Sequence, residues 1–197
     1  MIEVFKKYIQ EHTPINDAQF ELLSRELTER SYSKGRILVR QGDLMSISYF
    51  VARGLLRSYT IDNTGKEHII QFAPENWWIG DRNSGYFNEP AVFFIDVVED
   101  AQVIHISRHF MDRAQEVCPE FSRYTIYLLH NTIRHMQLRI NQLLAATAEE
   151  RYLDFIRLYP NVTLRVPQMM IASYLGITPE SLSRVKKELA KRYYGPK

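Results

Sequence analysis

A segment from about Glu120 to beyond Leu144 contains neither glycine nor proline and carries a heptad pattern of apolar residues. The pattern steps alternately by three and four residues, through Ile126, Leu129, Ile133, Met136, Ile140 and Leu143. This spacing is typical of the a/d seam of a coiled coil. A second apolar stripe, at Phe121, Tyr124 and Leu128, faces another way, so a single long helix here needs two partners. We therefore predict a helix that packs on its own subunit and also forms a parallel homodimer. Burial of one face alone is the alternative.

Composition indicates a globular protein with an ordinary core rather than a polycation. The chain has 197 residues, 45% of them hydrophobic, and a net charge of only +2, so a nucleic-acid surface has to be local. The single cysteine, Cys118, excludes a disulfide framework, a CxxC redox pair, a four-cysteine iron–sulfur cluster and a cysteine-rich zinc site. No apolar run approaches the roughly 18 residues of a membrane span, and the amphipathic N-terminus is unlike a signal peptide. We therefore expect no membrane contact and a cytoplasmic location.

Between helical sections at residues 2–30 and 108–158, the chain changes to strand character. Residues 31–107 are rich in β-branched and aromatic residues and contain turn signals such as "DNTGKE" at 62–67. The segment "AVFFIDVVEDAQVIHIS" is expected to supply two strands that turn at Glu99-Asp100. Many short strands at this spacing are typical of an antiparallel roll or barrel. The predicted class is α+β, an antiparallel, jelly-roll-like β-roll (a double-stranded β-helix) with flanking helices.

The stretch "QMMIASYLGITPESLSRVKK", residues 168–187, meets the requirements of a helix-turn-helix in one window. Ala172 is small enough for two helices to touch, and Gly176 accepts the left-handed turn conformation. Thr178 is a good N-cap, and Pro179 loses no needed hydrogen bond in the first helical turn. The positions expected to pack the pair into one core are Ile171, Leu175, Ile177, Leu182 and Val185. The alternative is an αα-hairpin that serves only as a packing unit.

The face of the second helix opposite this core, within residues 179–192, favours DNA binding over packing alone. Arg184 can donate to guanine O6 and N7, and Glu180 can accept from cytosine N4. Thr178 and Gln168 are expected to bond phosphate through the side chain and a helix N-terminus. Basic side chains that suit contacts with DNA phosphates lie toward the end of the helix, at Lys186, Lys187, Lys191 and Arg192. The predicted DNA-binding set is Gln168, Thr178, Glu180, Ser181, Arg184 and Lys187.

The order of parts resembles the Crp–Fnr family of bacterial transcription regulators, over nearly the whole chain. The likeness rests on "KGRILVRQGD" (34–43), "YFVARGLLRSY" (49–59), "WIGD" (78–81), the long helix and "IASYLGITPESLSRVKKEL" (171–189). The resemblance implies an N-terminal cyclic-nucleotide-binding-type β-roll, a long dimerisation helix and a C-terminal winged helix-turn-helix. It also implies that Glu180 and Arg184 stand at the family's two main base-reading positions. Pro179 stands where some members carry a further arginine, so the target sequence should differ from theirs.

Departures from the family pattern concern the effector and the end of the chain. Members that bind cyclic AMP have glutamate where this chain has Asp81, and an Arg-Ser pair where it reads Ala91, Val92, Phe93 and Phe94. A buried phosphodiester without such partners is costly, so we expect cyclic AMP not to bind. The lone cysteine excludes the iron–sulfur oxygen sensing of another branch. The effector pocket, if there is an effector, is expected to involve Gly80, Asp81, Arg82, Asn83 and Ser84. The tail "AKRYYGPK" leaves little room for the wing, which is expected to be truncated.

Two functions from other classes stay open: a cupin-like metalloenzyme and a ligand-binding β-roll adaptor, both without DNA binding. Metal sites of the first kind need two or three histidines and a carboxylate converging from neighbouring strands. Only His68 and His105 lie on predicted strands, and no HxH, GxSxG, HExxH or Walker pattern occurs. No catalytic or metal-binding residue is therefore assigned. The tryptophans of "NWWIGD" (76–81) are interpreted either as core packing or as a lid or interface.

The sequence thus predicts a homodimeric DNA-binding regulator and not an enzyme. The expected parts are a β-roll sensor domain at 1–118, a dimerisation helix at 119–146 and a helix-turn-helix domain at 147–197. The expected partners are double-stranded DNA and a second copy of the chain, with RNA polymerase as a further candidate. No cofactor is assigned apart from a candidate small-molecule effector.

Overall fold

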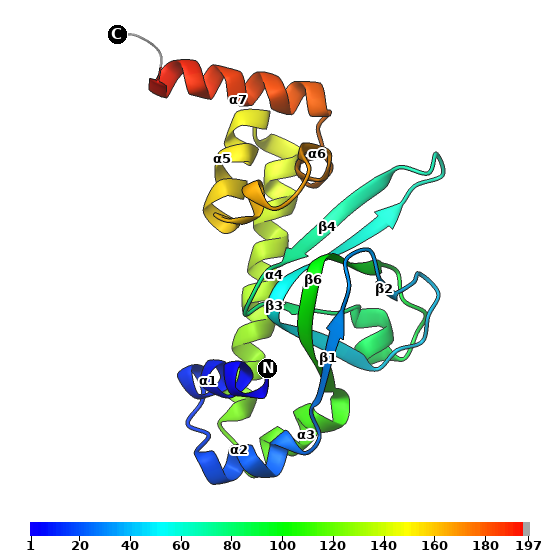
Figure 1. Ribbon diagram of the computed structural model, residues 1–197, viewed down its shortest axis with the longest axis vertical. Coiled ribbons are helices and arrows are strands. Elements are labelled where there is room, and N and C mark those ends of the chain that lie inside the picture. The colour runs from blue at the N-terminus through cyan, green and yellow to red at the C-terminus, as the bar shows by residue number, and fades with distance from the viewer. Residues whose placement is uncertain (195–197) are drawn as a thin grey trace. The chain divides into compact units, whose positions relative to one another are not determined.

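The computed structural model describes residues 1–194, which divide into two compact units (Figure 1). The first unit combines Met1–Thr60 with Ile70–His130, and the second combines Ile61–Ile69 with the chain from Asn131 onward. The tip of a β-hairpin therefore belongs with the C-terminal part of the chain. The predicted domain boundaries at 118 and 146 stay predictions.

The strands form one six-stranded sheet in the order β1-β6-β3-β4, with β2 paired to β6 and β5 paired to β3. The pairings of β1, β2, β3 and β5 are antiparallel, which confirms the predicted antiparallel roll. The strand bounds are Thr28–Tyr32 (β1), Ile37–Val39 (β2), Ile47–Ile61 (β3), Glu67–Ala73 (β4), Trp78–Ile79 (β5) and Phe94–Ser107 (β6).

The two long strands β3 and β6 pair along their length through several register shifts between Val51 and Leu56. The predicted turn at Glu99-Asp100 is wrong, because β6 continues unbroken through it. Gly54 supplies the physical reason: its φ is +94°, and a Cβ atom there would lie 2.4 Å from the carbonyl oxygen of Asp100. The strand pair therefore bends at a close backbone contact, as bulged strands do, instead of reversing.

Three helices pack against one end of the roll and share a core with the start of the long helix α4 (Figure 1). They are α1 (Ile2–His12), α2 (Asp17–Ser24) and α3 (Arg108–Val117). Asn16 caps α2 through a reciprocal capping box with Gln19. Phe121 and Tyr124 of α4 are buried in this core, and Leu128 packs against it. The second apolar stripe of the long helix therefore faces its own subunit, as predicted.

The two tryptophans of residues 76–81 pack into separate cores. Trp78 contacts the rings of Phe5 and Phe50, with centroids 5.7 and 5.8 Å apart. Trp77 packs against the other buried cluster, which includes Val51. Because both rings lie against core residues, the core-packing interpretation accounts for them.

One ion pair is buried inside the roll. Arg57 of β3 and Asp96 of β6 are direct partners across the ladder and form two hydrogen bonds of 2.8 Å, from Nε and Nη2. The guanidinium also lies 4.3 Å from the ring centroid of Tyr59. The bidentate geometry offsets the cost of removing both charges from water.

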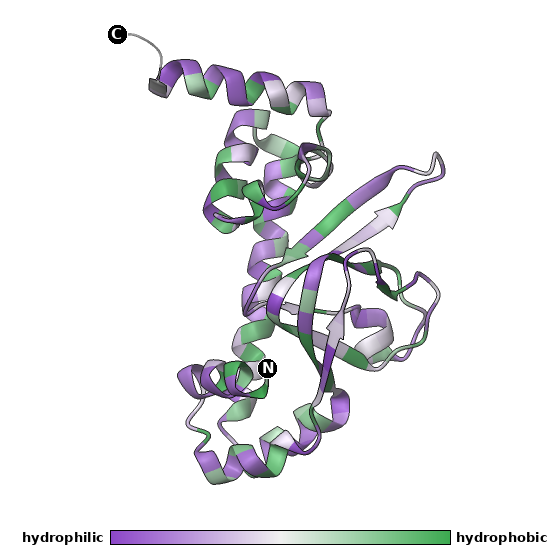
Figure 2. Ribbon diagram, in the orientation of Figure 1, coloured by the Kyte–Doolittle hydropathy of each residue, from purple (hydrophilic) through white to green (hydrophobic). Residues whose placement is uncertain are grey.

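The C-terminal elements are helical. Their bounds are Phe121–Ala145 (α4), Ala148–Leu158 (α5), the 3₁₀ turn Val162–Leu164 (η2), Gln168–Leu175 (α6) and Pro179–Tyr194 (α7). Figure 2 shows hydrophilic residues along most of α7, interrupted by hydrophobic ones. The predicted long helix and the predicted helix pair are both confirmed. The wing would follow α7, and the end of the chain at residues 195–197 lies outside the described residues.

Candidate nucleic-acid interface

The helix-turn-helix consists of α6, a tight turn at Gly176 and α7. Gly176 has a φ of +67°, the left-handed conformation that ends helices. Thr178 caps the second helix, because its Oγ1 accepts a hydrogen bond of 3.2 Å from the Ser181 amide. Pro179 is the first residue of α7. The roles predicted for these turn residues are therefore confirmed.

A small apolar core holds the two helices together. Ala172 is almost fully buried, as close contact between helices requires. Ile177, which was expected in this core, is only half-buried. The other predicted core positions are buried, namely Ile171, Leu175, Leu182 and Val185. Tyr152 and Phe155 of α5 are buried in the same unit.

The polar face of α7 points to solvent. Glu180, Arg184 and Lys187 are exposed, and their spacing of four and three residues puts them on one helix face. The hydrogen bond to its own backbone amide lowers the pKa of Glu180, with a further contribution from the Thr178 hydroxyl. This carboxylate is therefore charged at neutral pH and can act as a hydrogen-bond acceptor.

The remaining predicted contacts differ in exposure. Gln168 opens α6 and is exposed, as is Thr178. Ser181 is half-buried, and its hydroxyl lies 3.2 Å from Thr178 Oγ1. Arg192 forms an ion pair with Glu149 of α5, with a shortest distance of 2.5 Å. Arg192 therefore joins α7 to α5, a role that differs from the phosphate contact expected of it.

Two arginines that the sequence analysis did not single out hold the end of α6. Arg151 of α5 donates from Nη1 to the Leu175 carbonyl at 2.7 Å. Arg139 of α4 donates from Nη2 to the Tyr174 carbonyl at 3.0 Å. Carbonyls in the last turn of a helix lack intrahelical partners, so these guanidinium groups complete the helix end. Neither arginine carries a spacing signal, because the contact depends on how three helices pack.

The predicted dimer seam on α4 is largely uncovered within the chain. Ile133, Met136 and Ile140 are 50%, 53% and 57% exposed. Ile126 and Leu143 are similarly exposed, whereas Leu129 is half-buried. A single helix face with this much exposed apolar surface favours a partner.

Of the five residues predicted for an effector pocket, Gly80, Asp81 and Arg82 lie between β5 and the π-helical turn η1 (Asn83–Phe87), and Asn83 and Ser84 begin that turn. Asp81 is buried, and its carboxylate accepts hydrogen bonds from the amides of Val92 and Phe93 at 2.8 and 3.0 Å. It also accepts one from the Ser84 amide at 3.1 Å. These bonds close the loop 81–93 on itself.

Other members of the predicted pocket also have partners or tight surroundings. The Ser84 hydroxyl donates to the Met45 carbonyl at 2.7 Å. A Cβ atom at Gly80 would lie 2.6 Å from Ser48 Oγ. Arg82 is exposed, and Asn83 is half-buried. The polar groups of Asp81 and Ser84 therefore hold the loop together, and the pocket assignment stays a prediction.

The histidines on strands have individual partners. His68 lies 2.7 Å from an Asp62 oxygen, and His105 bonds the Tyr32 hydroxyl at 3.0 Å. Burial lowers the pKa of His105. Within residues 1–194, no group of three or more His, Cys, Asp or Glu side chains could hold a metal ion. None of the helices in this described part has both the length and the apolar character needed to cross a membrane.

Comparison with known proteins agrees with this architecture. Residues 29–116 match the model of the cyclic nucleotide-binding domain. The anaerobic regulatory protein of Pasteurella multocida is 26% identical over 189 residues, which cover 90% of this chain and 68% of that protein. The transcriptional activator protein FnrA of Stutzerimonas stutzeri is 28% identical over 167 residues, 79% of this chain and 68% of that protein. This chain thus spans about two thirds of the length of these relatives.

The solved structures show the same fold. The structure of FixK2 from Bradyrhizobium japonicum superposes with a TM-score of 0.71 at 23% identity, covering 84% of this chain and 85% of that one. The roll, the long helix and the helix-turn-helix follow one another in this chain, and its relatives by sequence are named as regulators. In sequence and in fold the chain is therefore similar to transcription regulators of the Crp–Fnr type.

Proposed function

We propose that this protein binds double-stranded DNA sequence-specifically as a homodimer and thereby regulates transcription in the cytoplasm. One observation carries the proposal: Glu180, Arg184 and Lys187 are exposed along the second helix of a capped helix-turn-helix. The names of the relatives, an anaerobic regulatory protein and a transcriptional activator, support a regulatory role. The proposed role is binding and not catalysis. RNA polymerase is the proposed further partner.

In the proposed complex, α7 enters the major groove with its exposed face toward the bases. Arg184 donates two hydrogen bonds to one guanine, and Glu180 accepts from a cytosine amino group. Lys187 and the neighbouring basic side chains neutralise phosphates, which supplies affinity without sequence information. Each good bidentate pair contributes about 1–3 kcal/mol of discrimination against a wrong base.

The proposed dimer uses the exposed seam of α4. Two parallel copies of the helix bury Ile133, Met136 and Ile140 against each other. A two-fold dimer presents two recognition helices to half-sites about one turn of DNA apart. Two modules are needed because one module of this size reads few bases.

The cyclic-nucleotide fold of the first unit does not by itself imply a cyclic nucleotide. The resemblance to members that bind cyclic AMP is broken at two places: Asp81 stands where they have glutamate, and residues 91–94, Ala-Val-Phe-Phe, stand where an Arg-Ser pair is expected. Within this stretch, the amides of Val92 and Phe93 already donate to Asp81. We propose that any effector of this protein is a small molecule other than cyclic AMP.

The test of the base-reading role is Arg184→Ala. We expect a loss of about 1–3 kcal/mol at the cognate site and relaxed preference at one base pair, because one bidentate contact is removed. A binding-site selection from random DNA, followed by affinity measurements over a range of salt, provides both quantities. Lys187→Ala is the matched control: it should weaken all sites alike and reduce the salt dependence by about one counterion. Unchanged preference in the Arg184 variant would remove that residue from base recognition.

The test of the dimer is a pair of charged substitutions on the seam, Met136→Glu and Ile140→Glu. We expect monomers with weak operator binding, since like charges would face each other across the two-fold axis. Analytical ultracentrifugation measures the oligomeric state directly. The control is Leu138→Glu, an exposed apolar position on the same helix but off the heptad seam. A dimer that survives both seam substitutions would contradict the assignment.

A further inference from the structure

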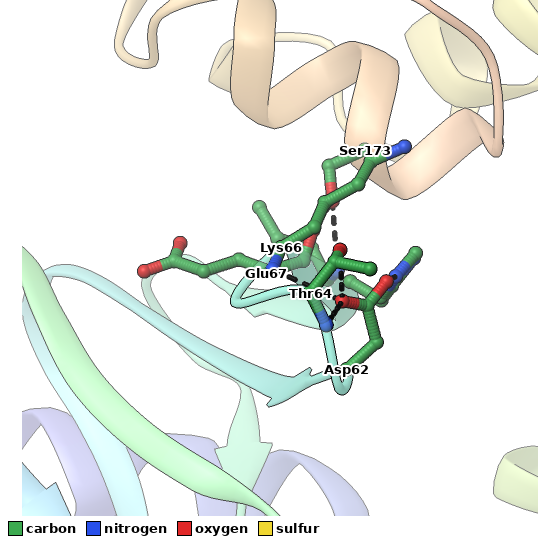
Figure 3. Close-up of polar contacts among 7 residues, drawn as sticks. Asp62, Thr64, Lys66, Glu67 and Ser173 are labelled. Atoms are coloured by element: carbon green, nitrogen blue, oxygen red, sulfur yellow. Dashed lines mark hydrogen bonds and ion pairs between the residues drawn. The ribbon is translucent and has the colours of Figure 1, made fainter.

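The tip of the β3–β4 hairpin contacts α6 within the second unit (Figure 3). Ser173, on α6, donates from Oγ to the Glu67 carbonyl at 2.7 Å. The same oxygen accepts a hydrogen bond of 3.0 Å from the Ile69 amide. One serine side chain therefore engages two backbone groups, which are two residues apart on one strand.

These backbone groups lie on the outer side of an edge strand. β4 is the last strand in the sheet order β1-β6-β3-β4, so within residues 1–194 no further strand pairs with its outer side. A carbonyl and an amide two residues apart are the groups that an added strand would bond. The Ser173 hydroxyl, as both donor and acceptor, takes the place of that strand at Glu67 and Ile69.

Arg139 of α4 reinforces the same contact. Its Nη2 donates to the Ile69 carbonyl at 2.7 Å and to the Tyr174 carbonyl at 3.0 Å. Its guanidinium carbon lies 3.9 Å from the ring centroid of Tyr174, which adds a cation–π contact. One side chain thus joins the hairpin edge to the end of α6.

The turn of the hairpin has its own internal support (Figure 3). The Asp62 carboxylate accepts hydrogen bonds from the Thr64 amide and hydroxyl at 2.9 and 2.6 Å, and from the Lys66 amide at 3.1 Å. His68 lies 2.7 Å from its other oxygen. The His68 hydrogen bond, followed by those from Thr64, lowers the pKa of Asp62. The outer edge of β4 at Glu67 and Ile69 therefore follows a turn that is held by its own hydrogen bonds.

We propose that Ser173 and Arg139 are positioning residues for DNA recognition, which hold the helix-turn-helix on the hairpin edge in its binding conformation. This inference rests on the proposed function. The contact leaves Glu180, Arg184 and Lys187 exposed, which favours preorganisation over masking of the DNA face. β3 and β4 continue from the hairpin into the roll. Besides α4, the hairpin is thus a second stretch of chain that connects the two units, and its contact with α6 is made by hydrogen bonds.

The test is Ser173→Ala in the full-length protein, because alanine keeps the helix and removes only the hydroxyl. We expect operator affinity to fall about 2- to 10-fold, the equivalent of about one net hydrogen bond. Base preference and salt slope should stay unchanged, since no DNA contact is lost. Ser173→Thr, which retains the hydroxyl, should restore affinity. Ser24→Ala, at another helical serine bonded to a backbone carbonyl, is the matched control and should change nothing.

A second variant and a second measurement make the result independent of folding problems. Arg139→Gln should weaken operator binding in the same way, and the double variant should lose less than the sum, because both residues act on one edge. Hydrogen exchange of the Ile69 amide, measured without DNA, reports its hydrogen bond to Ser173. The exchange rate should rise in Ser173→Ala because that bond is lost.

Faster exchange with unchanged or tighter DNA binding would overturn the positioning role and leave the proposed function intact. Unchanged exchange would show that the contact does not hold in solution. Absence of DNA binding by the unaltered protein would instead overturn the proposed function.

Discussion

The roll and the helix-turn-helix use the same kinds of polar side chain in opposite ways. In the roll, Arg57 and Asp96 are buried and hydrogen-bonded to each other, and the Asp81 carboxylate accepts hydrogen bonds from backbone amides. On α7, Glu180 and Arg184 are exposed on one face of a helix. The charged side chains of the roll stabilise its fold, whereas those of α7 stay accessible to a binding partner. This contrast supports the exposed face of α7, and not the larger roll, as the proposed recognition surface.

The largest expected effect comes from breaking the buried pair with Asp96→Ala. The change leaves the Arg57 charge buried without its partner, which costs about 3–5 kcal/mol of the free energy of unfolding. Both tryptophans, Trp77 and Trp78, lie in the first unit, so denaturant unfolding followed by tryptophan fluorescence reports this region. Asp112→Ala, at an exposed helical position, is the control. Equal stability of the two variants would contradict a structural role for the pair.

A smaller effect is expected in the second region from Gly176→Ala. The left-handed φ of +67° costs alanine about 1–2 kcal/mol, and the new Cβ would lie 3.1 Å from Leu143 Cδ2. Because α5, α6 and α7 carry no tryptophan, unfolding should be followed by far-ultraviolet circular dichroism. Gly85→Ala is the control, since a Cβ there meets nothing within 4 Å. A variant as stable as the control would show that the turn tolerates a side chain.

The smallest expected effect is a null result with cyclic AMP. The roll has the apolar residues 91–94 where the resemblance places an Arg-Ser pair, and the amides of Val92 and Phe93 in this stretch are bonded to Asp81. A calorimetric titration should therefore give no binding heat. The Asp81→Asn variant, titrated alongside, checks whether removing the carboxylate's charge frees these amides. A micromolar Kd for the unaltered protein would contradict the contrast between the roll and α7. The roll would then bind an anion although its polar groups near residues 91–94 are bonded to Asp81.

Local patterns in the sequence predicted the parts that depend on near neighbours. The cap at Thr178, the turn at Gly176 and the two stripes of α4 all follow from spacing and from preferences for a backbone conformation. The same reasoning failed at Glu99-Asp100, which carries a turn signal inside a continuous strand. The partner strand overrode that signal, since Gly54 lets the two backbones approach and bend together.

By itself, then, the sequence determined the α+β class, the long helix and the position of the helix-turn-helix with its polar face. Only the tertiary structure decided that Arg57 pairs with Asp96, and that Ser173 covers the edge of β4 from a position 104 residues away from Ile69. The physical reason is the range of the interactions. Caps and helix stripes arise between residues a few positions apart. The Ser173 hydroxyl on the edge of β4 and the Arg151 guanidinium at the end of α6 depend instead on which surfaces the whole chain brings together.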